Sequence, residues 1–322
     1  MIYVQNEFAT LKRVVLAESE FGFPLEPRLE DLRFLKESAI QETLEHKGQD
    51  YKDAFPASQK QWEQEKIALI KVLMKYGVEV LRPRKLTLAE KQAAGNFGYS
   101  NFFARDPFFT IGNCVIEGSM RFLHRRNEIF PIREIINTIV YPEDCIYVSA
   151  PRAEITAVND PTLGVGPFIE GGDVLVLNKQ VFVGNSGLAS NKLGIEWLSK
   201  FLRSYGYKVE MARLHPDILH LDCALGMIRD GLMIVCEDAF LDGIPDSLQS
   251  WKRINVSLEE ATILATNGLP VSAEVYITDP AFSRIGEQIA AYGIHVEYVD
   301  YSVSRNFGGS FRCTTQPLLR MD

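Results

Sequence analysis

The hydrophobic pattern of the chain is dominated by short apolar runs that come in pairs. At four places, two such runs are separated by residues that favour tight turns, which is the strongest local signal for a β-hairpin. The four predicted hairpins are Phe108–Ile111 with Cys114–Ile116 across Gly112-Asn113, Val174–Leu177 with Val181–Val183 around Asn178-Lys179, Leu225–Ile228 with Leu232–Cys236 across Asp230-Gly231, and Ala261–Ala265 with Val271–Ile277 around Asn267-Gly268.

Three further segments carry apolar residues at helical spacing. They are Ile67–Met74, Leu193–Leu202 and Ile285–Ala291, and a Tyr-Gly pair and a short apolar run follow each of them, at Tyr76-Gly77, Tyr205-Gly206 and Tyr292-Gly293. Because glycine adopts the left-handed conformation of a helix end at little cost, the repeated phrase predicts a helix that ends directly before a strand. A hairpin–helix–strand unit therefore repeats along the chain, which predicts an α/β fold.

One segment does not fit the repeat. Leu25–Trp62 is charged and helix-prone, and we interpret it as an insertion. No linker rich in Pro, Gly or Ser divides the chain, so residues 1–322 are predicted to form a single domain.

Composition narrows the class of protein. The chain has 322 residues and a net charge of −8, with 46% hydrophobic and 24% charged residues, as in folded globular proteins. The acidic balance argues against nucleic acid or an anionic membrane surface as the main partner. No apolar run approaches the roughly 20 residues of a membrane helix, and the first residues lack the pattern of a signal peptide. We therefore expect a cytoplasmic protein.

The five cysteines are sparse and irregularly spaced, and no Cys-x-x-Cys pair occurs. This pattern indicates neither a disulfide framework nor a structural zinc site. Most of these cysteines are expected to be buried thiols, and one could serve as a nucleophile.

Polar groups interrupt strand-like sequence at four places. They are Arg105-Asp106-Pro107, the run Glu170-Gly171-Gly172-Asp173 before a predicted strand, His220-Leu221-Asp222, and a late Gly308-Gly309 ahead of Arg312-Cys313. Strand alternation would put His220 and Asp222 on one face. Taken alone, each group also fits a structural role: a turn, a loop, a buried polar pair or a packed thiol. Together they supply a cysteine nucleophile, an acid/base histidine and orienting carboxylates, which is the set that covalent catalysis needs.

Other signatures are weak. His215 and His220 are poorly spaced for a shared metal, and Gly164-Val165-Gly166 lacks the third glycine of a dinucleotide loop. We expect no metal and no cofactor.

In this order, the four motifs resemble those of the guanidine-modifying superfamily of arginine deiminases and amidinotransferases. The likeness is greatest to the glycine amidinotransferases and to the amidinotransferases of aminocyclitol biosynthesis, through Ile116–Met120, Asn191–Leu198 and Trp251–Val256. It covers nearly the whole chain and is loosest over Leu25–Trp62.

The resemblance implies a fold and a set of roles. The family fold is a five-fold pseudosymmetric α/β propeller (pentein) of ββαβ modules around a central site, here forming one catalytic domain. By motif, Cys313 would be the nucleophile, His220 the acid/base and Glu170 the group that orients His220. Asp106 and Asp222 would grip the planar guanidinium, whose N–H donors match carboxylates.

The chain departs from its family where a substrate carboxylate would bind. Related amidinotransferases usually carry His before the nucleophile, where this chain has Arg312. Ser186–Ala189 and Asp238–Phe240 lack the arginines that hold the carboxylate in deiminases and glycine amidinotransferases. We assign substrate binding to Arg312 and Arg253 instead, and a donor without a carboxylate is an equal alternative.

The preferred hypothesis is an amidinotransferase that moves the amidino group of arginine or a related guanidine to an amine through a covalent Cys313 intermediate. The alternative is a deiminase-type hydrolase in which water is the second nucleophile. A third is a catalytically inactive protein that binds a guanidinium ligand. The expected partners are a small guanidine donor and an amine acceptor, and the sequence leaves open whether the chain forms a homo-oligomer.

Overall fold

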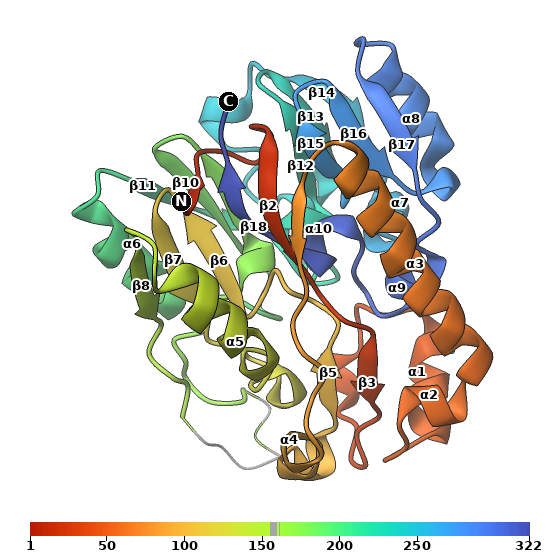
Figure 1. Ribbon diagram of the computed structural model, residues 1–322. Helices are drawn as coiled ribbons and strands as arrows, with labels where there is room; N and C mark the ends of the chain where they lie inside the picture. The colour runs from red at the N-terminus through yellow and green to blue at the C-terminus, as the bar shows by residue number, and fades with distance from the viewer. Residues whose placement is uncertain (155–159, 161) are drawn as a thin grey trace.

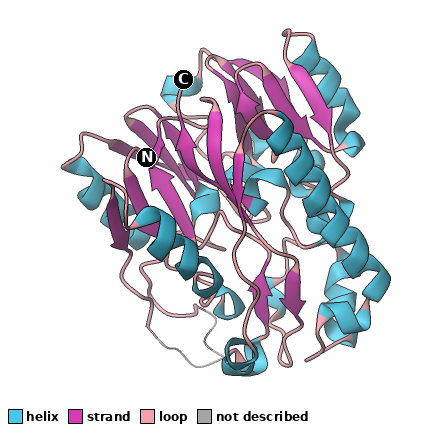
Figure 2. Cartoon of the chain, in the orientation of Figure 1, coloured by secondary structure: helices cyan, strands magenta, loops and turns pink. Residues whose placement is uncertain are grey.

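The structure is a computed structural model that describes residues 1–154, 160 and 162–322. Its strands form small sheets arranged around a centre, with most of the long helices on the outside (Figures 1 and 2). Four consecutive units begin with an antiparallel hairpin, whose second strand pairs in parallel with a third strand further along the chain. The four units are β6 (Phe108–Ile111), β7 (Cys114–Glu117) and β8 (Ile146–Ser149); β9 (Val174–Leu177), β10 (Gln180–Asn185) and β11 (Lys208–Arg213); β12 (Leu225–Arg229), β13 (Leu232–Val235) and β14 (Lys252–Asn255); and β15 (Leu269–Ser272), β16 (Val275–Thr278) and β17 (His295–Tyr298).

The fifth unit is built from both ends of the chain. In place of a hairpin it has an antiparallel pair of β18 (Thr315–Arg320) and β2 (Leu11–Leu16), and the short β1 (Tyr3–Val4) extends the sheet beside β18. The helix α3 (Pro56–Lys75) then leads to β4 (Glu79–Leu81), which pairs in parallel with β2. The five units therefore close into a ring, and the fold is the predicted five-fold α/β propeller.

The helices of the other units vary in length. The longest after α3 is α6 (Lys192–Arg203), followed by α8 (Ser283–Ala290), whereas α5 (Arg133–Ile135) continues into a short π-helical stretch at Ile136–Val140. Between β13 and β14 the described chain forms only short 3-10 turns. The predicted helix ends are confirmed, because Gly77, Gly206 and Gly293 have φ angles of 74°, 76° and 77°. The strands β4, β11 and β17 begin two residues after them.

Three of the four predicted hairpins are confirmed, and the fourth is wrong. Residues Leu258–Thr262 form the helix α7, which begins with a capping box between Ser257 and Glu260. The turn between β15 and β16 lies at residues 273–274 rather than at Asn267-Gly268. Gly268 is needed for another reason, since a Cβ there would lie 2.3 Å from the hydroxyl of Tyr276.

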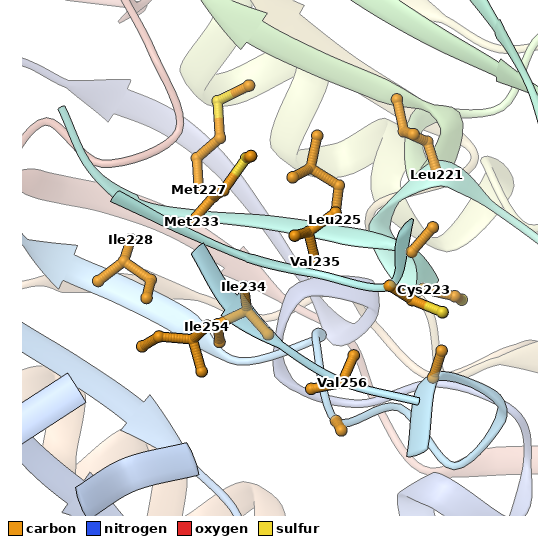
Figure 3. Close-up of a cluster of buried hydrophobic side chains, with 14 of the residues drawn as sticks. Leu221, Cys223, Leu225, Met227, Ile228, Met233, Ile234, Val235, Ile254 and Val256 are labelled. Carbon is orange, nitrogen blue, oxygen red and sulfur yellow. The ribbon is translucent and has the colours of Figure 1, made fainter. Parts of the chain in front are cut away.

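The core follows the sheets. In Figure 3 the β12–β13 pair and β14 present apolar side chains on both faces, with Leu225 and Met227 on one side and Ile228, Ile234 and Ile254 on the other. Leu221 and Cys223, in the 3-10 turn before β12, are buried in the same cluster. The residue between them, Asp222, is therefore fixed by packing on both sides.

The predicted insertion covers one end of the ring. It contains α1 (Glu37–Glu45), α2 (Tyr51–Ala54) and the start of α3, and it lies with the two-stranded sheet of β3 (Glu20–Gly22) and β5 (Tyr99–Asn101) and with α4 (Leu88–Ala93) at the lower end of the molecule in Figure 1. A cluster of aromatic residues joins this layer to the ring, and Trp62 at its centre is fully buried. None of the helices described here has the length and apolar character needed to cross a membrane.

Gly194 gives a test of the packing between α6 and the chain that leads to Glu170. A Cβ at Gly194 would lie 1.8 Å from the backbone oxygen of Phe168. Alanine normally stabilises a helix interior by up to ~1 kcal/mol over glycine, but here we expect Gly194→Ala to lower the free energy of unfolding by about 2 kcal/mol or more.

The measurement is urea unfolding, with Gly206→Ala as control. Nothing lies within 4 Å of a Cβ at Gly206, so this variant should lose only the ~1 kcal/mol of a left-handed alanine. A Gly194→Ala variant as stable as the parent would contradict the packing described.

Candidate active site

Five loops meet at the end of the ring that the insertion covers. Each loop directly precedes the first strand of a unit, and three of them place a polar residue two positions before that strand: Asp106 before β6, Asn267 before β15 and Cys313 before β18. The remaining two loops are 3-10 turns, Gly171–Asp173 before β9 and Leu221–Cys223 before β12. The pseudosymmetry of the fold therefore brings side chains that are far apart in sequence to one point.

The pair Gly171-Gly172 allows the loop before β9 to approach the loops that carry Asp106 and His220. A Cβ at Gly171 would lie 2.0 Å from the backbone oxygen of Arg105, and one at Gly172 would lie 2.6 Å from Asp106 Oδ1 and 2.7 Å from His220 Nδ1. The backbone N–H of Gly172 donates to Asp106 Oδ1 at 2.8 Å. Any larger residue would push apart the loops that carry the acid and the histidine.

His220 is held between two carboxylates. Its Nε2 lies 2.9 Å from Glu170 Oε2, and its Nδ1 lies 3.9 Å from Asp106 Oδ1. Burial lowers the pKa of His220, but the charge of Asp106, the hydrogen bond that His220 donates to Glu170 and the charge of Asp173 outweigh it and raise the pKa to about 10. The imidazole is therefore protonated near neutral pH. Asp222 lies in the 3-10 turn Leu221–Cys223, and His220 directly precedes that turn. The predicted strand at these two residues is therefore wrong.

Cys313 is buried beside Asp222. Its Sγ lies 3.6 Å from Asp222 Oδ2, and its backbone N–H donates to Asn267 Oδ1 at 3.2 Å. Burial and the negative charges of Asp222 and Asp106 raise the pKa of the Cys313 thiol well above its ordinary value. The cysteine is therefore a thiol near neutral pH. Because its raised pKa comes partly from two carboxylates, a cation bound between them would lower it.

Arg312 points inward and is fully engaged by the protein. Its Nη1 donates to Asp222 Oδ2 at 2.8 Å, and its Nε and Nη2 donate to the two oxygens of Glu7 at 3.1 and 3.2 Å. Burial raises the pKa of Glu7, but Arg312 and Arg105 outweigh it and lower the pKa to about 2. Glu7 is thus a charged partner that fixes the arginine. The geometry makes Arg312 a support for Asp222.

Arg125 supports Asp106 in the same way as Arg312 supports Asp222. Its Nη2 donates to Asp106 Oδ2 at 2.7 Å and to Glu128 Oε2 at 2.8 Å, and its Nη1 lies 3.7 Å from Glu170 Oε2. Glu170 also accepts the backbone N–H of Arg121 at 2.8 Å. Both carboxylates predicted to grip a guanidinium are therefore oriented by an arginine of the chain itself.

Sequence reasoning missed three of these residues. Asn267 was hidden in an apparent turn pair, and Arg125 lies in a basic run, His124-Arg125-Arg126, that resembles an exposed surface segment. Glu7 carries no signal in a single sequence. Only the closed ring, which brings the N-terminal residues beside β9, gives it a role: Glu7 Oε1 accepts the backbone N–H of Val176.

Arg253 is not brought to this site. It lies on β14, and its guanidinium donates to Glu237 Oε1 and to Gln249. The other six candidates form two contact groups, one of Asp106, Glu170 and His220 and one of Asp222, Arg312 and Cys313. Gly172 joins the two groups, because its N–H donates to Asp106 and its backbone oxygen lies 3.5 Å from Arg312 Nη1. Among the described residues, no group of three or more His, Cys, Asp or Glu side chains could hold a metal ion.

The arrangement suits a planar cation. Each carboxylate oxygen has two lone pairs, so Asp106 and Asp222 can accept further N–H donors while they hold Arg125 and Arg312. The Cys313 thiol contacts Asp222, and the protonated His220 imidazole lies between Glu170 and Asp106.

The comparisons agree with this geometry. The sequence model of the arginine deiminase family matches residues 96–261, and the chain belongs to that family, within the guanidine-modifying superfamily. The uncharacterized protein YkgA of Bacillus subtilis is 26% identical over 318 residues, which cover 98% of this chain and 94% of that protein. Inosamine-phosphate amidinotransferase 1 of Streptomyces glaucescens is also 26% identical, over 99% of this chain and 97% of its own.

A solved structure has the same fold. The inosamine-phosphate amidinotransferase of Streptomyces griseus superposes with a TM-score of 0.84 at 22% identity, and the match covers 100% of this chain and 97% of that one. The predicted pentein fold is therefore confirmed along the full length of the chain.

The raised pKa of His220 makes a prediction about stability. Its pKa moves from 6.5 to about 10 on folding, so the protonated form contributes stability that is complete below pH 6.5 and is lost as the pH rises towards 10. We expect His220→Asn to be less stable than the parent at pH 6.5 and the difference to shrink as the pH approaches 10.

Urea unfolding across this pH range measures the difference. The matched control is His295→Asn, since the side chain of His295 is 61% exposed. A stability difference for His220→Asn that does not change with pH would show that His220 is not held as a cation in the folded protein.

Proposed function

We propose that this protein is an amidinotransferase that transfers the amidino group of a guanidine donor to an amine through a covalent intermediate on Cys313. The observation that carries the proposal is the convergence of Cys313, His220 and two arginine-supported carboxylates at one buried point. The sequence likeness to an amidinotransferase over 99% of the chain supports it.

The donor guanidinium binds between Asp106 and Asp222. Forked N–H donors and paired carboxylates fix the plane of the cation, so its central carbon faces the sulfur. The added positive charge offsets the carboxylates that keep Cys313 protonated. The thiol then loses its proton to solvent as the cation binds, and Asp222, 3.6 Å from Sγ, stays charged and holds the cation. The substrate thus activates the nucleophile that attacks it.

The thiolate attacks the guanidinium carbon, and a C–S bond forms. The imidazolium of His220 donates its proton to the departing nitrogen, the C–N bond breaks, and an amine leaves. A thiouronium remains on Cys313, and His220 is now neutral. The incoming amine attacks the same carbon and gives a proton to His220 as the C–S bond breaks. This step restores the thiolate and the imidazolium, so the proton balance closes without a cofactor.

Glu170 and Arg125 position this acid/base. Glu170 accepts from His220 Nε2, and Arg125 lies against Glu170 and Asp106. The imidazole therefore has a fixed ring plane and keeps its Nδ1 edge towards Asp106 and the bound cation.

The hydrolase remains the second candidate because the arginine deiminase family model matches half of the chain. Its first half-reaction would be identical. Water instead of an amine would then attack the thiouronium and give a urea.

The two are separated by product analysis with guanidino-labelled arginine and guanidino-labelled agmatine, with and without a panel of primary amines. We expect label on the added amine, and the amine released from the donor only when an acceptor is present. Label in a urea product without any amine would establish the hydrolase.

Cys313→Ser should lower turnover about 10³-fold or more, since it removes the covalent step. The control is Cys145→Ser, a change of the same kind at a half-buried thiol near β8. Mass spectrometry of the parent protein with donor alone should find one amidino group on Cys313. Normal turnover in Cys313→Ser would rule out the covalent mechanism.

A further inference from the structure

An aromatic cavity lies between the insertion and the loops of the site. Its volume is about 80 Å³, against the roughly 10–15 Å³ that one water needs. The insertion contributes Phe34 and Tyr51, Phe23 lies just before it after β3, and the ring side contributes Phe102, Leu123 and Phe307.

The cavity adjoins the candidate active site. Phe102 and Phe307 precede Asp106 and Cys313 in their loops by four and six residues, and the lining residue His124 is next to Arg125. Phe23, Tyr51, Phe102 and Phe307 also pack in the same apolar cluster as Cys313. The loops that carry the reacting groups therefore form one wall of the cavity.

The charges of the lining are mostly negative. The lining contains Glu26, Asp31 and Glu42 and one cation, Arg28. Arg28 Nε donates to Asp31 Oδ2 at 2.9 Å, and its Nη1 donates to the backbone oxygen of Asp160. A second cation, Arg121, lies behind Asp31 and outside the lining. Burial lowers the pKa of His124 to about 3, so this ring is neutral. Aromatic faces and an excess of carboxylates attract organic cations.

One carboxylate oxygen of this cavity lacks a hydrogen bond. Asp31 is 6% exposed, and its Oδ1 has no hydrogen-bond partner among the described residues. Arg121 Nη1 lies 3.9 Å away, within range of an ion pair but too far for a hydrogen bond. A buried acceptor without a donor costs about 1–3 kcal/mol. Asp31 lines the cavity, so an ammonium bound there would compensate the charge of this carboxylate.

We propose that this cavity binds the end of the substrate remote from Cys313, and that this end is an ammonium group on an apolar carbon chain. The inference rests on the proposed function and specifies its substrate class. Donor and acceptor use the same site in turn, so the donor is an aminoalkylguanidine and the acceptor a diamine. A carboxylate in the same position would face Asp31 and Glu42 and be repelled.

Binding calorimetry on Cys313→Ser tests the proposal without turnover. The probes are agmatine and 4-guanidinobutanoate, which share the guanidinium and a short methylene chain and differ in the group at the far end. We expect agmatine to bind at least about tenfold more tightly. Equal affinity, tighter binding of 4-guanidinobutanoate, or no binding of either probe would overturn the proposal.

Charge-removing variants in the same background locate the effect. Asp31→Asn and Glu42→Gln should each reduce the preference for agmatine several-fold. Glu45→Gln is the matched control, because Glu45 is on the same helix as Glu42 but is exposed and outside the lining. A preference that survives both cavity variants would place the ammonium elsewhere.

The proposed function fails independently of this test. Absence of an amidino group on Cys313 in the parent protein with either labelled donor would refute the covalent chemistry, whereas the calorimetric preference does not depend on any reaction.

Discussion

The structure depends on how it keeps several carboxylates charged in its interior. Asp106, Glu170 and Asp222 are at most 1% exposed, and an isolated buried carboxylate would be protonated or would destabilise the fold by several kcal/mol. Arg125, Arg312 and the His220 imidazolium compensate them at hydrogen-bond or ion-pair distance. Glu7 in turn holds Arg312 and ties the start of the chain to the centre. Removal of one member would leave a charge of its partner unpaired, so the ring and the site are stabilised together.

The same network sets the protonation states of the site. Asp106, which helps to keep His220 charged, also disfavours a negative charge on Cys313, together with burial and Asp222. The site therefore holds an imidazolium and a thiol, and a cation between the carboxylates would lower the pKa of that thiol.

The proposed reacting groups and the proposed substrate-selecting cavity come from different parts of the chain. The loops before the strands carry the reacting groups, and the pseudosymmetry of the ring fixes their positions. The insertion contributes Phe34, Tyr51 and the charges around Asp31 to the lining of the adjoining cavity. Under the proposed ammonium site, a change of the insertion would alter the preferred substrate while the ring and its loops stay the same.

The sequence by itself determined the local units and the candidate chemistry. Turn pairs and the Tyr-Gly helix ends depend on short-range backbone preferences, so three hairpins and three helix ends could be predicted, and the motifs placed six of the seven candidate residues at one site. Asn267-Gly268 was misread because the close approach of Tyr276, a tertiary contact, requires that glycine. Arg253 was misplaced because no local signal tells an inward arginine from one paired with Glu237. Only the tertiary structure revealed Glu7, Arg125 and the orphan oxygen of Asp31, because each depends on partners distant in sequence that closure of the ring brings together.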